Sequence, residues 1–184
     1  MKTKTGNIWD FIGKVDAICI TTNGYVKRDG TCPMGRGIAK EALSRYPKID
    51  KILGLYLKQY GNRPFKLVKE KDTWICSFPT KEAGLELSLS FCREQEFLGK
   101  DYIDQVLTWA QGHYRKGDIV PGYHLQSNKA LIQASAEKLV LMADKFNWKK
   151  IILPPPGCGN GGLSWPTILP FLSCLDDRFI VVAK

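Results

Sequence analysis

Hydrophobic positions in this chain alternate between short apolar runs and longer stretches with helical spacing. The runs have the length of strands, the first at an edge and most of the others buried; they cover residues 1–5, 15–22, 65–70, 73–78, 149–153 and 179–182. Apolar positions three or four apart predict helices over 38–46, 48–60, 128–146 and 165–175. This alternation predicts one α/β domain over 1–184, with a mixed sheet and helices on both faces.

The second half of the chain contains a strand, a glycine-rich loop and a helix start in direct succession. Three prolines end the strand of 149–153, and four glycines follow within residues 157–162. Ser164 is a candidate N-cap, and Pro166 suits the first turn of a helix. Successive backbone N–H groups in such a loop, together with a helix N-terminus, form an anion site. A tight turn without a ligand is the alternative, because this loop matches no established phosphate-binding fingerprint.

A second loop of the same kind follows the strand of 15–22. Residues 34–39 contain two glycines and lead into the helix of 38–46. Two such loops in one domain suggest a grip on both halves of a diphosphate.

Polar residues mark the ends of two predicted strands. Thr22 and Asn23 follow the first of them, and Lys81 lies just past the strand of 73–78, with Pro79 fixing a turn. Because ligands of open α/β sheets bind at carboxyl strand ends, these residues are site candidates. The alternative for Lys81 is an ordinary surface lysine.

Composition narrows the classes of function. No apolar run approaches the ~20 residues of a membrane span, and we expect a cytoplasmic protein without a signal peptide or membrane partner. Six cysteines without a Cys-x-x-Cys pair suggest buried thiols in a reducing compartment. Only two histidines are present, which argues against a zinc hydrolase and against a Ser-His-Asp triad. No metal or cofactor is expected.

The net charge of +9 is unevenly distributed. Residues 82–124 contain four basic and seven acidic side chains, a net −3, so the rest carries +12. A basic body favours a polyanionic partner such as a nucleotide or DNA, and a solvated lysine surface is the alternative. The acidic segment, with a predicted helix at 102–109, is interpreted as an insertion that covers or shapes a site.

Taken in order, these motifs resemble those of the macro domain family, whose fold binds ADP-ribose. Residues 6–8 lie where the family has Gly-Asp-Ile, 16–23 resemble its strand ending in Asn, and 34–39 and 156–165 resemble its two phosphate loops. Residues 78–81, Phe-Pro-Thr-Lys, are most similar to the branch with the DarG antitoxin and the terminal ADP-ribose glycohydrolase, where this lysine is catalytic.

The resemblance implies a three-layer fold with adenine near Asn7 and Ile8, a diphosphate between the loops, and Lys81 beside the distal ribose. The implied ADP-ribose site consists of Asn7, Ile8, Thr22, Asn23, Gly35, Arg36, Gly37, Ile38, Ala39, Cys158, Gly159, Asn160, Gly161, Gly162 and Leu163. The expected partner is ADP-ribose or an ADP-ribosylated macromolecule, and Lys81 is the expected catalytic residue.

The chain departs from the family pattern at three positions. Asn7 replaces an aspartate, Gly161 stands where the terminal glycohydrolase has a catalytic aspartate, and Ser164 replaces another aspartate. Four hypotheses follow: a hydrolase of ADP-ribose conjugates that uses Lys81, a non-catalytic ADP-ribose binding module, an ADP-ribose-1″-phosphate phosphatase, and a plain nucleic-acid binder.

Overall fold

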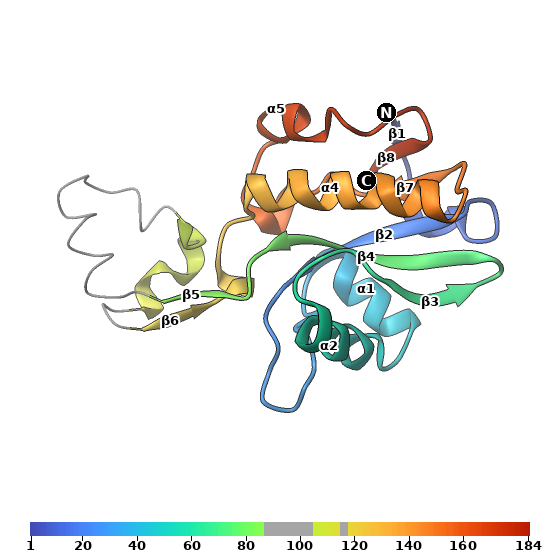
Figure 1. The fold of residues 1–184 in the computed structure, drawn as a ribbon. Coiled ribbons are helices and arrows are strands. Elements are labelled where there is room, and N and C mark those ends of the chain that lie inside the picture. Colours follow the sequence, from blue (N-terminus) through green and yellow to red (C-terminus); the bar gives the residue numbers. More distant parts are fainter. Residues whose placement is uncertain (87–104, 115–117) are drawn as a thin grey trace.

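A six-stranded mixed sheet forms the centre of the protein (Figure 1). The computed structural model describes residues 1–86, 105–114 and 118–184. The strand order is β1-β8-β7-β2-β4-β3, and only the β3–β4 pair within this sheet is antiparallel. The strands are β1 (Lys2–Thr5), β2 (Ala17–Asn23), β3 (Lys66–Glu70), β4 (Thr73–Lys81), β7 (Ile151–Leu153) and β8 (Phe179–Ala183).

Helices cover both faces of this sheet, which confirms the predicted α/β class. In Figure 1, α1 (Gly37–Arg45) and α2 (Ile49–Tyr60) lie on one side, and α4 (Lys129–Lys145) and α5 (Trp165–Ile168) lie on the other. Helix α4 falls within the helix predicted over 128–146, and Asn128 is its N-cap, because its side chain accepts a hydrogen bond of 3.0 Å from the N–H of Leu131.

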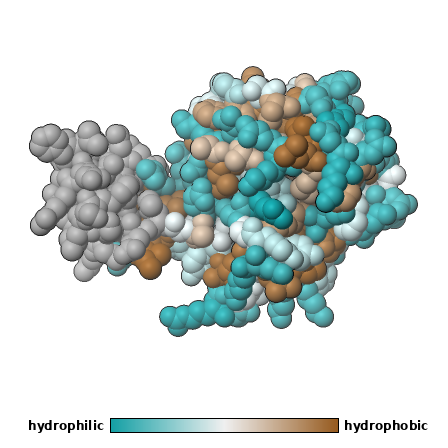
Figure 2. Space-filling view, in the orientation of Figure 1, coloured by the Kyte–Doolittle hydropathy of each residue, from teal (hydrophilic) through white to brown (hydrophobic). Residues whose placement is uncertain are grey.

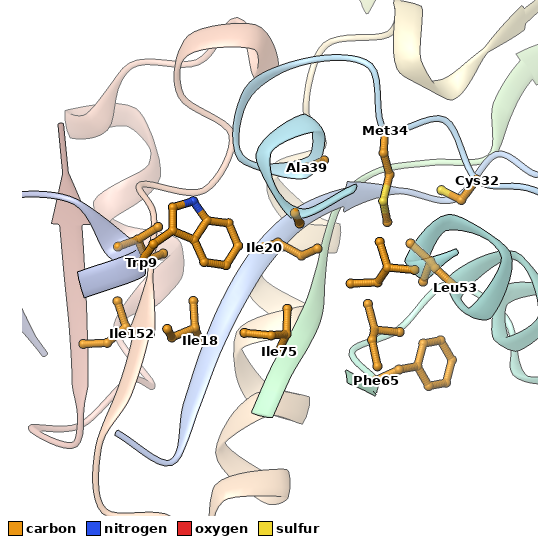
Figure 3. Packing of buried hydrophobic residues seen from close by; sticks show 14 of the residues in the cluster. Trp9, Ile18, Ile20, Cys32, Met34, Ala39, Leu53, Phe65, Ile75 and Ile152 are labelled. Atoms are coloured by element: carbon orange, nitrogen blue, oxygen red, sulfur yellow. The ribbon is translucent and has the colours of Figure 1, made fainter. Parts of the chain in front are cut away.

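Alternate residues of the central strand β2 serve the two halves of the core. Ile18 and Ile20 pack into the cluster under α1 and α2, which Figure 3 shows with Leu53 and Ile75. Ala17 and Cys19 face the cluster under α4. Because successive side chains of a strand point to opposite faces, a sheet buried on both sides is apolar at nearly every position.

Strand β4 is longer than the sequence predicted. It continues through Pro79 to Lys81, so Pro79 lies inside the strand and does not fix a turn before Lys81. Strand β3 pairs with β4 as far as Cys76, and the Ser77 N–H still donates to the carbonyl oxygen of Phe65, but within the described residues no strand pairs with Pro79 on that side. A proline without an N–H is tolerated at such an edge.

Two predicted helices differ from those observed. The helix predicted at 165–175 is the short α5 followed by a 3₁₀ turn, Leu169–Leu172, which contains Pro170. The helix predicted at 102–109 lies partly outside the described residues. Its described part contains an isolated bridge from Val106 to Leu125 and the start of a 3₁₀ helix, Thr108–His113.

The segment between β4 and α4 contributes a separate two-stranded sheet. Strand β5 (Gly84–Glu86) pairs antiparallel with β6 (Ile119–Pro121), and the 3₁₀ turn Gly122–His124 follows. This segment leads the chain back to the cavity described below.

The surface view in Figure 2 shows hydrophobic patches separated by hydrophilic residues. Among the described residues, no helix has the length and apolar character needed to cross a bilayer. Five cysteines have free thiols there; Cys19, Cys32 and Cys76 are buried, Cys158 is half-buried and Cys174 is exposed.

Candidate functional site

A cavity of about 830 Å³ lies at the carboxyl ends of four neighbouring strands. Its lining includes residues from the ends of β2, β4 and β8 and from just beyond β7, together with both glycine-rich loops. This is the edge at which parallel sheets place their ligands.

The two glycine-rich loops face each other across this cavity. Gly37 has a φ of 55°, which favours glycine, and a Cβ built on it would lie 3.2 Å from the Nδ2 atom of Asn160. Gly159 in the second loop has a φ of 63°. Two glycine-rich loops that approach this closely allow backbone N–H groups from both to face one bound anion.

Lys81 projects from the end of β4 toward the second loop and is only 9% exposed. Its Nζ donates hydrogen bonds to the carbonyl oxygen of Asn160 at 3.0 Å and to that of Tyr123 at 3.4 Å. Burial and then the charge of Arg36 lower the pKa of Lys81 to about 8. About one tenth of such an amine is neutral at pH 7, whereas an ordinary lysine is almost fully charged.

Thr22 and Asn23, at the end of β2, also line the cavity. The Asn23 amide donates to the carbonyl oxygen of Pro33 at 2.9 Å and accepts from the N–H of Tyr25 at 3.0 Å. It therefore fixes the chain that leads to the first loop. The Thr22 hydroxyl is buried and has no hydrogen-bond partner among the described residues.

Gly161 lies against a buried serine. A Cβ built on Gly161 would be 2.4 Å from Ser127 Oγ, and the Ser127 N–H donates to the Gly161 carbonyl oxygen at 2.8 Å. There is no room for a carboxylate at position 161 as long as Ser127 keeps its place. An aspartate at this position would therefore require the Ser127 side chain to move.

The structure brings most of the residues predicted for the site into this one cavity. Those that line it are Ile8, Thr22, Asn23, Gly35, Arg36, Gly37, Ile38, Ala39, Lys81, Cys158, Gly159, Asn160 and Gly161.

Asn7, Gly162 and Leu163 are not among the lining residues. Asn7 Oδ1 accepts from the N–H of Trp9 at 3.1 Å and caps a 3₁₀ turn, Ile8–Phe11. Gly162 faces Leu107 and Gln126. Leu163 packs against the core under α4, so it holds the second loop in place.

Sequence reasoning missed several residues of the cavity wall: Glu41, Leu107, Trp109, Tyr123, His124, Ser127 and Lys184. Three of them form an aromatic group: Trp109 from the 3₁₀ helix before β6, and Tyr123 and His124 from the 3₁₀ turn after β6. The His124 ring lies 4.6 Å from Trp109 and 4.5 Å from Tyr123, centroid to centroid. The guanidinium of Arg36 lies 4.2 Å from the centre of the Trp109 ring.

His124 is held in this group by a hydrogen bond between its Nδ1 and the Tyr114 hydroxyl. Burial lowers the pKa of His124, and the positive charges of Arg36 and Lys81 act in the same direction. The imidazole is therefore neutral at pH 7 and adds no charge beside Lys81. Within the described residues, no three His, Cys, Asp or Glu side chains gather into a metal-binding cluster.

This fold, with two facing loops at the strand ends, is that of a macrodomain. Among solved structures, the chain is similar to the macrodomain of Mycobacterium tuberculosis DarG, with 19% identity, a TM-score of 0.62, and coverage of 100% of this chain and 96% of that one. The macrodomain of Thermus aquaticus DarG is similar at 19% identity and a TM-score of 0.60, covering 100% and 97%.

A structure of Thermosipho africanus DarTG in complex with ADP-ribose is similar at 16% identity and a TM-score of 0.60. The match covers 100% of this chain and 42% of that protein. No family model matches the sequence, and no curated protein does.

Proposed function

We propose that this chain binds ADP-ribose in the cavity and hydrolyses ADP-ribose conjugates with Lys81. The observation that carries the proposal is the position of the Lys81 amine. It is buried at the cavity wall and hydrogen-bonded to the carbonyl oxygen of Asn160, in the loop that would hold the diphosphate. The ADP-ribose in the structure of T. africanus DarTG supports the choice of ligand.

The pKa of Lys81, about 8, makes the amine a usable nucleophile near neutral pH. In the proposed reaction the neutral amine bonds to C1″ of the distal ribose, and the bond from C1″ to the acceptor breaks. The acceptor leaves with the proton that the amine gives up. Water then releases ADP-ribose and restores the lysine.

DNA is a suitable acceptor for the ADP-ribose because the chain outside residues 82–124 carries +12. Phosphate contacts to such a surface provide much of the affinity of proteins for nucleic acids. ADP-ribosylated protein is the second acceptor to be compared.

The experiment measures ADP-ribose release from ADP-ribosylated DNA and protein by the wild type and by Lys81→Ala, with ADP-ribose affinity measured in parallel. The proposal predicts release by the wild type only, and similar affinity in both proteins. Full activity of the variant would remove Lys81 from the reaction.

One observation favours a binding module without turnover. Among the described residues, no carboxylate pairs with Lys81, and the contact with Ser127 disfavours one at position 161. Binding of ADP-ribose without hydrolysis of any conjugate would select this function. Phosphate release from ADP-ribose-1″-phosphate would instead select the phosphatase.

A further inference from the structure

The cavity extends well beyond Lys81, to the far end of four adjacent strands. Lys81 ends β4, whereas Val182, Ala183 and Lys184 line the cavity at the end of β8, with β2 and β7 between them. Neighbouring strands lie about 4.8 Å apart, so these two ends are separated by about 14 Å. A ligand whose ribose lies at Lys81 and whose diphosphate lies between the loops has its nucleobase at the β8 end.

An acidic side chain lies at that end. Glu41 on α1 is the one acidic side chain among the described residues that line the cavity. Its Oε2 accepts from the indole Nε1 of Trp9 at 2.7 Å, and its Oε1 accepts from Lys184 Nζ at 2.5 Å. The bond to Lys184 lowers the pKa of Glu41, with a further contribution from Trp9, so the group is ionised at neutral pH.

The hydrogen-bonding capacity of this carboxylate is not exhausted. An ionised carboxylate has about four lone-pair positions, and Trp9 and Lys184 use two. Lys184 can only donate, and Asn7 does not line the cavity, its side-chain oxygen accepting from the Trp9 N–H. Glu41 is therefore the side chain that offers acceptor sites to a nucleobase here.

We propose that Glu41 selects the base of the ligand by accepting a hydrogen bond from an exocyclic amine. This inference rests on the proposed binding of ADP-ribose and adds a determinant of base specificity. Adenine presents an amine at C6, whereas hypoxanthine presents a carbonyl oxygen at the same position. An oxygen placed against a carboxylate leaves two acceptors facing each other without a proton, which is unfavourable.

The test is calorimetric binding of ADP-ribose and of inosine diphosphate ribose, which differ at C6, an amine against a carbonyl oxygen, and at the adjacent N1, which carries a proton only in hypoxanthine. The wild type is expected to prefer ADP-ribose by about tenfold or more, the ratio that corresponds to about 1.4 kcal/mol. In Glu41→Gln the ratio is expected to fall within about threefold, because an amide accepts from an amine and donates to a carbonyl equally well. The ratio is the readout because removing a negative charge also changes the affinity for any diphosphate.

Two controls separate base selection from charge and packing. Glu137→Gln removes an exposed carboxylate of α4, outside the cavity lining, and is expected to keep the preference. Lys184→Met breaks the ion pair but leaves the carboxylate bound to Trp9, and is also expected to keep it.

Equal ratios in wild type and Glu41→Gln, or a loss in Lys184→Met as large as in Glu41→Gln, would overturn the inference. Absence of ADP-ribose binding by the wild type would contradict the proposed function instead. Binding of both ligands with equal affinity would leave that function intact and refute only the role of Glu41.

Discussion

Replacing Lys81 with methionine is expected to stabilise the protein at neutral pH. Methionine keeps an unbranched side chain of similar length but has no charge to desolvate. The folded protein holds the Lys81 ammonium in a position that is 9% exposed, where its pKa falls from 10.5 to about 8. The variant removes that cost.

The pKa difference sets the size of the effect. A pKa lowered by about 2.5 corresponds to about 3 kcal/mol. The hydrogen bonds to the carbonyl oxygens of Asn160 and Tyr123 offset about 1–2 kcal/mol of it. The free energy of unfolding should therefore rise by about 1–2 kcal/mol at pH 7, which for a chain of this length raises the melting temperature by about 2–8 °C.

The pH dependence follows from the two protonation states. Below about pH 8 the lysine is charged in both the folded and the unfolded protein, so the folded state bears the whole cost. Between pH 8 and 10.5 the unfolded state binds more protons than the folded state, so the unfolding free energy of the wild type rises with pH relative to that of the variant. The advantage of Lys81→Met should thus be complete below about pH 8 and absent by about pH 10.5.

Urea unfolding of both proteins from pH 6.5 to 10.5 measures this difference directly. Lys138→Met, at an exposed position of α4, is the matched control and should show no pH-dependent gain. Two results would contradict the presence of a desolvated ammonium at position 81. One is a Lys81→Met variant less stable than the wild type at every pH, and the other is a gain in unfolding free energy that does not change between pH 7 and 10.

Three further predictions concern the cavity wall. Gly161→Asp should destabilise the protein, because its Cβ would lie 2.4 Å from Ser127 Oγ, and adding Ser127→Gly should restore much of the lost melting temperature. Arg36→Gln should raise the pKa of Lys81 above about 8, since the Arg36 charge helps to lower it; NMR titration of labelled lysine would show an unchanged pKa if this reasoning is wrong. Trp109→Ala should weaken ADP-ribose binding about two- to fivefold, because the ring that orients the Arg36 guanidinium, worth about 0.5–1 kcal/mol, is lost. Unchanged affinity in calorimetry would show that Arg36 needs no such support.

The core elements were predictable because their sequence patterns are local. The apolar run of β2 and the helical spacing of apolar residues in α4 each indicate their structure without knowledge of the rest of the chain. Lys81 was assigned a position after a turn, and the structure has it within β4, because whether a proline fits a strand depends on a distant neighbour. That neighbour, β3, ends its pairing before Pro79, which no local pattern reveals.

The candidate site also combines features with a local sequence pattern and features set by distant residues. Glycine loops have a compositional pattern, so both were predicted, and the structure places them around one cavity. Glu41 and Lys184 are 143 positions apart and come into contact only in the folded chain. The same holds for Arg36 and Trp109. Asn7 was predicted to meet the adenine from its place in the motif, but its side chain caps a 3₁₀ turn and does not line the cavity.

A crystal structure of the protein with ADP-ribose tests the central claim most directly. The account predicts the diphosphate between Gly37 and Asn160, the adenine beside Glu41, and C1″ of the distal ribose within contact distance of Lys81 Nζ. A ligand bound outside the cavity, or one inverted so that adenine lies at Lys81, would contradict it.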